Sequence, residues 1–454
     1  MINFFIKTYG CQANVADSQA LSNYLMQLGA KQVSNEKDAD LIFINTCAIR
    51  ERAEEKFFSY LGSFVKFKNL KPYLKIGVIG CVASYRKKEI FSRFGLVDFV
   101  FGVKEDSSLL KNYIIDLVLK LNVEKKIYYK ISDEFFEQNE DLILSKQNFS
   151  NLYMGGFKNS NNELKKSFIN IMTGCNNYCS YCIVPFTRGR EKSYPANEIL
   201  KRVEQDVASG AKEIMLLGQN VNSYKDPQSG KGFAKLLNDV AKIDGDFWVR
   251  FVSSHPKDMT KDVLHVMADN KDKLCGFVHY PIQSGSNKIL RVMNRIYTVE
   301  QYLEQIGWIK DILSEATIST DVIVGFPGET EQDYLQTCKV LKEVKFYNVF
   351  SFIYSPRKYT RAALLKDDCP KKVKLKRLEA LQEMQRQISK DLNFLNVGKT
   401  LKCLVEKRLA NDKLLARTQG NIRVLFEGGD DIIGTFVYLK IKNVGVANML
   451  GSLI

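Results

Sequence analysis

The sequence predicts an α/β protein in three parts: a Rossmann- or flavodoxin-like parallel-sheet domain, a central β/α (partial TIM) barrel and a small C-terminal antiparallel β-barrel. Three observations predict it. Short apolar runs alternate with helical stretches over residues 1–118, and the same alternation returns over 166–390. Residues 391–454 hold short strand-like runs separated by Gly, Asn and Asp. Between the first two parts, residues 119–165 are charged and rich in Asn and Gly, as expected of a linker or insertion.

The first part contains four short apolar runs suited to buried parallel strands, at residues 4–6, 41–44, 76–79 and 99–101. Helical stretches separate them, such as 16–28 and 54–67. Strands joined by helices in this way form a parallel sheet with crossover helices.

The central part offers six candidate strands, which indicates an open or complete β/α barrel: 168–171, 213–217, 247–252, 277–281, 318–324 and 349–353. In such barrels the chemistry lies at the carboxyl ends of the strands. A Lys-rich amphipathic helix follows, with Leu375, Leu378, Leu381, Met384 and Ile388 on one side. The tail then offers strands at 401–405, 414–417, 423–426 and 436–442.

Composition narrows the class of protein. The 454 residues carry a formal net charge of +15, which fits a polyanionic partner such as nucleic acid but also a proteome that is simply rich in lysine. Neither a signal peptide nor a membrane-length apolar stretch is visible, so we expect a cytoplasmic protein without a membrane. Thiols stay reduced there, so the ten cysteines favour metal ligation over disulfides.

Cys175, Cys179 and Cys182 follow the strand expected at 168–171. Three thiolates within eight residues can hold one corner of a metal cluster, and four-iron clusters usually have four cysteine ligands. Three ligands would leave one iron open to an exogenous ligand, which an enzyme needs. Zinc or buried apolar cysteines are the alternatives, but zinc would need a fourth ligand and no histidine is close in sequence.

Cys11, Cys47 and Cys81 each come just after a predicted strand of the first part. Adjacent parallel strands lie about 5 Å apart, so cysteines at their carboxyl ends can converge. Gly10 and Gly80 suit a close approach of the backbone to a bulky ligand. We therefore expect a second cluster here.

The C-x3-C-x2-C spacing resembles the signature of the radical S-adenosylmethionine (SAM) superfamily. Further segments resemble the methylthiotransferases within it, nearly end to end. They are Asn45-Thr-Cys-Ala-Ile-Arg50, Gly80-Cys-Val-Ala83, Gly174-Cys-Asn-Asn-Tyr-Cys179, Thr187-Arg-Gly-Arg190, Gly218-Gln-Asn-Val-Asn222, Ser254-His-Pro256, Pro281-Ile-Gln-Ser-Gly-Ser286 and Gly325-Phe-Pro-Gly-Glu-Thr330. The tail resembles the RNA-binding TRAM domain.

The resemblance implies a reaction and its cofactors. A methylthio group would replace the C2 hydrogen of N6-isopentenyl(dimethylallyl)adenosine beside a tRNA anticodon, in a single-stranded loop that exposes its bases. Two [4Fe-4S] clusters would take part, on Cys11, Cys47 and Cys81 and on Cys175, Cys179 and Cys182. One SAM would methylate sulfur at the first cluster; another, chelated at the open iron of the second, would give a 5′-deoxyadenosyl radical. The partners would be the anticodon stem-loop and an external electron donor, and we expect a monomer.

The resemblance also implies contacts with SAM at Gly218, Gln219 and Asn220, after the second barrel strand, and at Gly325, Pro327 and Glu329, after the fifth. Turn geometry would explain the glycines and proline as well. Gln283, Ser284 and Ser286 could bind the SAM ribose or cap a helix. His255 and His279 follow strands but suit a structural role equally. In the tail, Lys407, Arg408, Arg417 and Arg423 could meet RNA phosphates or only solvent.

The chain departs from the family pattern at one loop. After Phe350-Ser-Phe-Ile-Tyr-Ser-Pro-Arg357 the family usually continues Pro-Gly-Thr-Pro-Ala, whereas this chain has Lys358-Tyr-Thr-Arg-Ala362. Losing two prolines and a glycine changes the turn that can form.

Three alternatives remain open. Sister enzymes methylthiolate threonylcarbamoyl-adenosine in tRNA or an aspartate of a ribosomal protein, although the Gly218–Asn222 segment resembles the isopentenyl type. A non-catalytic RNA-binding or electron-transfer protein would not need two three-cysteine sites.

No motif surrounds Cys275, Cys338, Cys369 or Cys403, and we expect them to be dispensable.

Overall fold

The computed structural model describes the chain except residues 49–50, 65–66, 69–70, 104–106, 130–165 and 411. The chain forms two compact units: residues 1–158 with 173–176 and 183–191, and residues 159–172 with 177–182 and 192–454. Of the predicted linker 119–165, residues 130–165 lie outside the described residues. Its beginning is helical, because α5 (Ser107–Tyr129) continues beyond residue 119.

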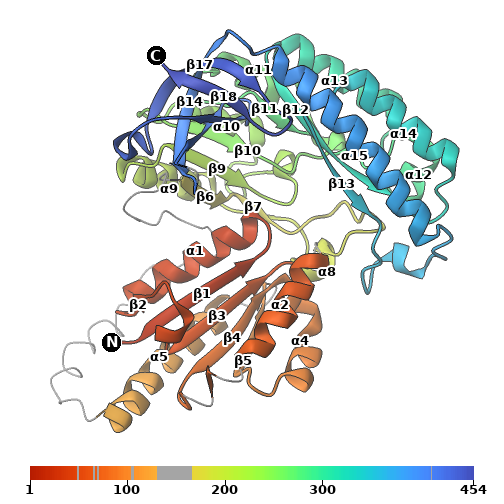
Figure 1. Cartoon of the computed structure of the whole chain (residues 1–454). Helices are drawn as coiled ribbons and strands as arrows, with labels where there is room; N and C mark the ends of the chain where they lie inside the picture. The colour runs from red at the N-terminus through yellow and green to blue at the C-terminus, as the bar shows by residue number, and fades with distance from the viewer. Residues whose placement is uncertain (49–50, 65–66, 69–70, 104–106, 130–165, 411) are drawn as a thin grey trace. The chain divides into compact units, whose positions relative to one another are not determined.

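The first unit is built on a parallel sheet of order β2-β1-β3-β4-β5 (Figure 1). Four strands confirm the predicted runs: β1 (Asn3–Tyr9), β3 (Leu41–Thr46), β4 (Lys75–Gly80) and β5 (Phe99–Gly102). The fifth, β2 (Lys31–Gln32), has two residues and no apolar run, so sequence patterning missed it. The order is that of the flavodoxin-like fold, whose ligands bind where the strand order reverses, at the carboxyl ends of the first and third strands.

Helices cover both faces of this sheet. Successive side chains of β3 point to opposite faces, and both sets are apolar and buried. Ile42 and Ile44 pack with α2 (Glu51–Ser63) and α4 (Cys81–Arg93). Leu41 and Phe43 pack on the other face with α1 (Gln12–Gln27) and α5. The short α8 (Val184–Thr187) belongs to this unit too.

The second unit contains two parallel three-stranded sheets, of order β10-β9-β6 and β11-β12-β13. A parallel bridge between Val249 and Leu274 links them. The strands confirm the six predicted ones: β6 (Lys166–Asn170), β9 (Glu213–Leu217), β10 (Trp248–Phe251), β11 (Phe277–His279), β12 (Thr317–Val324) and β13 (Asn348–Ile353). Their sequential order is that of an open β/α barrel.

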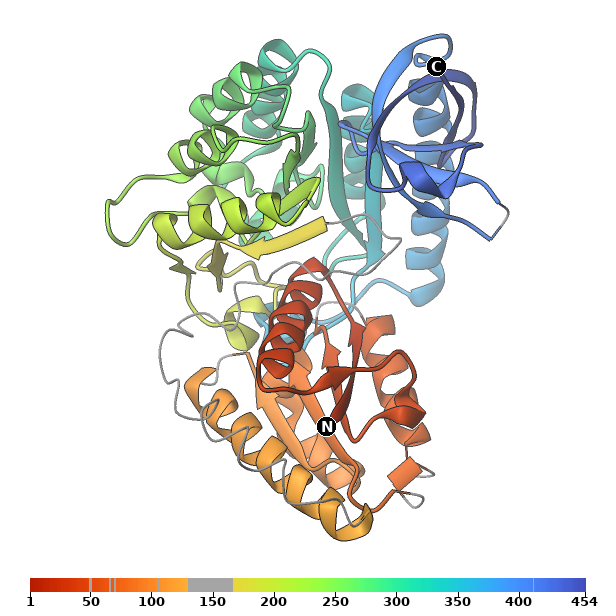
Figure 2. The same cartoon turned by 90° about the vertical axis from the view of Figure 1, so that its left-hand side faces the viewer.

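Helices connect these barrel strands and cover their outer side (Figure 2). They are α9 (Ala196–Ala208), α10 (Phe233–Ala241), α11 (Lys261–Asp269), α12 (Asn287–Val292), α13 (Val299–Ile312) and α14 (Glu331–Val344). The predicted Lys-rich helix is α15 (Lys371–Phe394), and β7 (Met172–Thr173) pairs with β8 (Lys192–Ser193). Among the described residues, every helix is too short or too polar to span a bilayer.

The tail is a closed barrel of order β14-β15-β16-β18-β17. Its strands are β14 (Thr400–Arg408), β15 (Leu414–Thr418), β16 (Arg423–Phe426), β17 (Phe436–Val444) and β18 (Met449–Leu453). The last was not predicted, because Gly451 and Ser452 interrupt its apolar pattern. The barrel docks on the core through Arg250, whose guanidinium donates to the carbonyls of Thr418 and Gln419 at 2.7 and 2.5 Å.

Candidate active site

Three cysteines meet at the carboxyl end of the first sheet. Tyr9 of β1 pairs in register with Thr46 of β3, and Thr46 pairs with Gly80 of β4. Cys47 and Cys81 are the next residues after two of these positions, and Cys11 comes one residue later after the third. The backbone N–H of Cys47 donates to the Tyr9 carbonyl at 2.8 Å. Registered strand ends therefore bring these three cysteines together.

The thiols of this triad interact with each other. A hydrogen bond with Cys47 is the largest cause that lowers the pKa of Cys11, to about 6, and nearby Arg188 lowers it further. Burial raises the pKa of Cys81, although Arg188 opposes the shift and hydrogen-bonds to it. Among the described residues, no three His, Cys, Asp or Glu side chains surround a point that suits a single metal ion. Three thiols beside a cation fit an anionic, thiolate-bound iron–sulfur cluster.

Gly10 and Gly80 are required by their protein neighbours. A Cβ on Gly10 would lie 2.9 Å from the Cys47 Cβ, and one on Gly80, at φ +97°, would lie 2.3 Å from Asn45 Oδ1. The close approach expected at these glycines is therefore made to protein atoms, the Cys47 side chain for Gly10 and the Asn45 side chain for Gly80. The Asn45 side chain in turn bonds Asn14 beside Cys11, because Asn14 Nδ2 donates to Asn45 Oδ1 at 2.9 Å.

Arg188 is a site residue that sequence reasoning missed. Its guanidinium is buried and donates to Asp17 Oδ2 at 2.8 Å. An arginine stays protonated, so it places a fixed positive charge beside Cys11 and Cys81. The only sequence signal was its place in the Thr187-Arg-Gly-Arg190 segment that carries the family resemblance.

Backbone hydrogen bonds hold the cysteines of the second triad. Cys175 lies with the first unit, where its N–H donates to the Gly189 carbonyl at 3.1 Å. Gly174 before it has φ +77°, and a Cβ there would lie 2.0 Å from the Arg190 carbonyl oxygen. Cys179 and Cys182 lie with the second unit, and the Cys182 N–H donates to the Cys179 carbonyl at 2.9 Å.

A second buried arginine accompanies Cys179. The Arg295 guanidinium donates to Cys179 Sγ at 3.5 Å and to the Pro281 carbonyl at 2.8 Å. Ser180, the next residue of the loop, donates its hydroxyl to the Val292 carbonyl at 2.8 Å. These bonds hold the cysteine loop against the segment after α12. Sequence reasoning missed Arg295, which lies outside every motif.

Buried polar atoms without a hydrogen-bond partner gather after β9 and β10. Among the described residues they include Gln219 Oε1, Asn220 Oδ1, Asn222 Oδ1, Ser254 Oγ and His255 Nε2. The pKa of His255 is lowered to about 2, mainly by burial and further by the positive charges of Arg295 and Lys257, so its ring is neutral. Such atoms usually find a partner, and a bound polar ligand would supply it. Gly218 instead allows close packing, because a Cβ there would lie 2.6 Å from Met172 Cγ.

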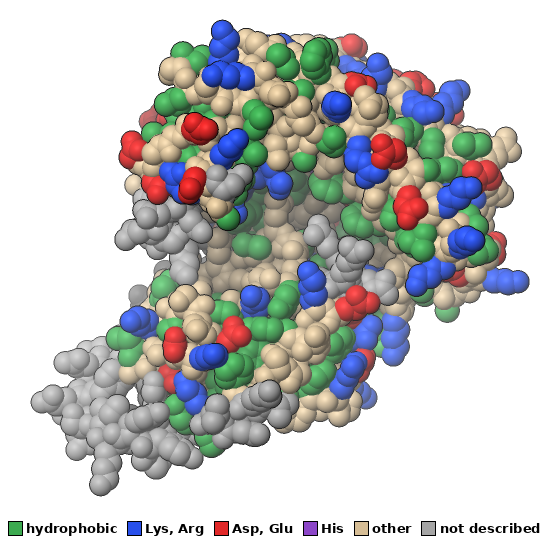
Figure 3. All heavy atoms as spheres, viewed as in Figure 1, with side chains coloured by type: hydrophobic (Ala, Val, Ile, Leu, Met, Phe, Trp, Pro, Cys, Tyr) green, Lys and Arg blue, Asp and Glu red, His purple; other side chains and the backbone are tan. Residues whose placement is uncertain are grey.

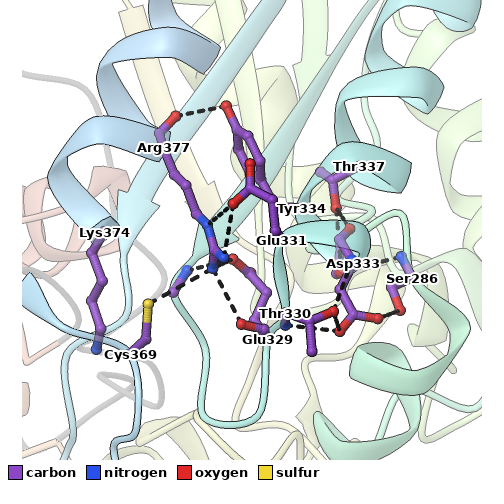
Figure 4. A network of polar contacts seen from close by, with 12 residues as sticks. Ser286, Glu329, Thr330, Glu331, Asp333, Tyr334, Thr337, Cys369, Lys374 and Arg377 are labelled. Carbon is purple, nitrogen blue, oxygen red and sulfur yellow. Dashed lines mark hydrogen bonds and ion pairs between the residues drawn. The ribbon is translucent and has the colours of Figure 1, made fainter.

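Two of the other predicted SAM contacts, Ser286 and Glu329, belong to a polar network (Figure 4). Gly325, at φ +67°, donates its N–H to Glu329 Oε1 at 3.0 Å, two residues beyond Pro327. Glu329 also pairs with Arg377 at 2.8 Å, and burial raises the pKa of Glu329. These bonds fix the turn after β12. Turn geometry was the alternative to SAM contact for Gly325 and Pro327.

Ser284 and Ser286 also have protein partners. Ser286 donates its hydroxyl to Asp333 Oδ1 at 2.7 Å and is the N-cap of α12, while Ser284 Oγ accepts from the Ser286 N–H at 3.2 Å. Gln283 has φ +70° and pairs with Val322 as an isolated bridge. Ser286 caps a helix, which was one of the two roles expected for it. Contact of these three residues with SAM stays a prediction.

The remaining candidates lie apart from the cysteines. His279 contacts Ser319 and Asp321 within the β11-β12-β13 sheet. In the tail, Arg417 pairs with Glu406 at 2.9 Å and Arg408 with Asp430 at 2.5 Å, so both guanidiniums already have carboxylate partners. Cys275 and Cys403 are buried in apolar clusters, as expected of residues outside the site.

Comparisons with known proteins agree with this arrangement. Residues 3–102 match the model of an uncharacterised protein family, UPF0004, and residues 169–341 match that of the radical SAM superfamily. The fold is similar to that of the radical S-adenosylmethionine methyltransferase TsrM from Kitasatospora setae. The TM-score is 0.54 at 12% identity, over 80% of this chain and 77% of that chain.

Relatives match from end to end. A tRNA-2-methylthio-N(6)-dimethylallyladenosine synthase of Carboxydothermus hydrogenoformans is 40% identical over 100% of this chain and 99% of its own length. One of Clostridium botulinum is 41% identical over 99% of this chain and 96% of its own. The chain therefore belongs to the tRNA-2-methylthio-N(6)-dimethylallyladenosine synthase family of radical SAM methylthiotransferases.

Proposed function

We propose that this protein replaces the C2 hydrogen of N6-isopentenyladenosine, next to the tRNA anticodon, with a methylthio group. The observation that carries the proposal is the convergence of Cys11, Cys47 and Cys81 at three registered strand ends, in a chain that also has a radical SAM cysteine loop. An electron carrier or RNA-binding module has no use for two such triads. The relatives' shared name describes the same product.

Two [4Fe-4S] clusters, one on each triad, and SAM would supply the methyl group, the sulfur chemistry and the 5′-deoxyadenosyl radical. The protein's part is to hold and tune them. Arg188 and Arg295 each place a positive charge beside cluster thiolates, which offsets the negative charge buried there. Gln219 and Asn220 would accept hydrogen bonds from SAM with oxygens that have no described partner. Gly218, Gln283, Ser284, Ser286, Gly325, Pro327 and Glu329 would shape the rest of the SAM site.

The proposal extends to the working context. The protein would act as a monomer in the cytoplasm, reduced by an external electron donor. Its RNA partner would be the anticodon stem-loop, whose phosphates suit a chain with a net charge of +15. Figure 3 shows Lys and Arg interspersed with Asp and Glu over much of the face it draws, so local sites have to be argued residue by residue.

The test uses anaerobically reconstituted protein, a reductant, SAM and an anticodon stem-loop that bears N6-isopentenyladenosine. Mass spectrometry of the digested RNA should reveal the 2-methylthio nucleoside. If 5′-deoxyadenosine forms while the nucleoside stays unmodified, the radical chemistry is right and the substrate is wrong. Stem-loops with threonylcarbamoyl-adenosine and the ribosomal protein substrate then become the next assays.

Cysteine variants assign the two triads. Cys47→Ala should abolish the methylthio product yet leave 5′-deoxyadenosine formation in place, because the second triad is intact. Cys179→Ala should abolish both. Cys403→Ala is the matched control, since Cys403 is equally buried but lies in the C-terminal barrel. A loss of iron in that control would contradict the assignment.

A further inference from the structure

The loop that departs from the family pattern is positively charged, and Asp367 and Asp368 follow it directly. Residues 355–366 include the cations Arg357, Lys358, Arg361 and Lys366 and no acidic residue. Lys358 and Arg361 are both exposed.

The loop is anchored directly to the radical SAM cysteine loop. The Ala362 N–H donates to the carbonyl of Ser180, between Cys179 and Cys182, at 2.8 Å. Ala362 is fully buried and packs in the apolar cluster that Tyr181 also contacts. Thr360 is 2% exposed, and its hydroxyl donates to the Arg357 carbonyl at 2.6 Å. The backbone is therefore fixed while Lys358 and Arg361 project into solvent.

Tyr359 adds an exposed aromatic ring in a strained conformation. Its φ is +73°, in the left-handed region that disfavours a bulky side chain. The ring is 55% exposed, so burial of apolar surface does not offset the strain. Lys358 Nζ lies 5.3 Å from the ring centroid. An aromatic ring beside cations is the combination that binds unpaired bases and their phosphates.

We propose that Arg357, Lys358, Tyr359 and Arg361 form a contact surface for a single-stranded RNA loop. The cations bind phosphates, and Tyr359 stacks on a base next to the one that enters the site. The inference rests on the proposed function and names the residues of this chain that would contact the RNA. Anchoring at Ser180 places the surface beside the cysteine loop, where a modified base must arrive.

The first experiment measures binding of a labelled anticodon stem-loop to the full-length reconstituted protein by fluorescence anisotropy, over a range of salt concentrations. The triple variant Arg357→Gln, Lys358→Gln, Arg361→Gln should bind roughly tenfold more weakly. Each lost contact with a single-strand phosphate should also reduce the slope of log K against log salt by about 0.7. The control removes three exposed lysines from α9 and α14, Lys201→Gln, Lys339→Gln and Lys342→Gln, and should leave both quantities unchanged.

The second experiment separates stacking from stability. Tyr359→Gly relieves the left-handed strain, so its melting temperature should stay the same or rise. Its affinity for the stem-loop should nevertheless fall roughly fivefold or more, because a stacked ring is lost. Tyr359→Phe keeps the ring and should bind like the wild type. A merely structural tyrosine would not produce this opposition between melting temperature and affinity.

The outcomes distinguish the two proposals. If the wild type methylthiolates the stem-loop while the triple variant, with normal iron content, binds with unchanged affinity and slope, the contact surface is wrong and the proposed function stands. If polyglutamate competes as strongly as the stem-loop, the surface recognises acidic chains in general and not RNA. If the wild type neither binds nor modifies the stem-loop, the proposed function fails and the surface with it.

Discussion

Buried charged residues are the part of this protein where single side chains matter most. Arg188 and Arg295 each lie beside a cysteine of one triad, and Glu213 lies between Lys166 and Arg250 under the C-terminal barrel. A buried charge that loses its partner is left uncompensated in a poorly polarisable environment. Each pair therefore makes a sharp prediction.

The pair of Arg188 and Asp17 can be tested by a double-mutant cycle. Both side chains are almost fully buried, so Arg188→Gln alone should reduce the free energy of unfolding by about 3–5 kcal/mol, because Asp17 stays charged. Adding Asp17→Asn should recover part of that loss. Denaturant unfolding of the first unit measures all three variants, and strictly additive effects would contradict the pairing.

Glu213 predicts a pH dependence. Burial would raise its pKa, but Lys166 and Arg250 outweigh burial and lower it to about 2, below its ordinary 4.5. A folded pKa below the unfolded one stabilises the fold at neutral pH, and that stability is lost as the pH falls from 4.5 towards 2. The stability gap between wild type and Glu213→Gln, about 3 kcal/mol at most, should shrink from pH 7 to pH 3. A gap that widens on acidification would contradict it.

At the scale of elements, the turn after β12 shows how loops of the barrel are fixed. Gly325, Glu329 and Arg377 are tied by hydrogen bonds, and Thr330 and Asp333 form a capping box at the start of α14 (Figure 4). The Gly325–Thr330 motif can therefore be explained by its turn and by helix capping, as well as by contact with SAM.

Two glycines provide a matched test of this turn. Gly325→Ala forces φ +67° on a residue with a Cβ, which would also meet Lys374 Cγ at 2.4 Å. We expect a loss of more than about 1 kcal/mol in the free energy of unfolding. Gly307 lies inside α13, where a Cβ would have no atom within 4 Å, so Gly307→Ala should gain about 0.5–1 kcal/mol. Thermal melting compares the two, and equal effects would refute the role of the turn.

At the scale of the whole chain, the C-terminal barrel is docked by specific bonds. Arg250 donates to the carbonyls of Thr418 and Gln419, and the Thr317 hydroxyl donates to the Gly420 carbonyl at 2.6 Å. The centroids of the Trp248 and Phe436 rings lie 4.7 Å apart. The barrel is therefore held on the core by several polar and aromatic contacts within the second unit.

Removing this anchor should loosen the barrel. Arg250→Met removes the guanidinium donor from the carbonyls of Thr418 and Gln419, and it leaves Glu213 with one cation fewer. Hydrogen exchange of residues 414–426 should accelerate about tenfold or more, while exchange in the first unit stays unchanged. Lys402→Met, which removes an exposed partner of Asp246 at the same barrel, is the control and should have little effect.

The sequence predicted most of the described strands, because short apolar runs between helical stretches are typical of buried parallel strands. It missed β2, β7, β8 and β18, which lack such runs. At the site, motif spacing indicated the six cysteines, whereas Arg188 and Arg295 approach them only through the fold, from residues whose partners are distant in sequence. Gly10 and Gly80 were expected beside a ligand, yet the structure places them against Cys47 and Asn45.

The register of β1, β3 and β4 has a consequence for assembly. A slip of one residue would move a cysteine by about 3.3 Å and turn the side chains of its strand to the opposite face. Only the correctly paired sheet presents Cys11, Cys47 and Cys81 together. Uptake of iron would therefore depend on correct register, and a misregistered chain should stay colourless.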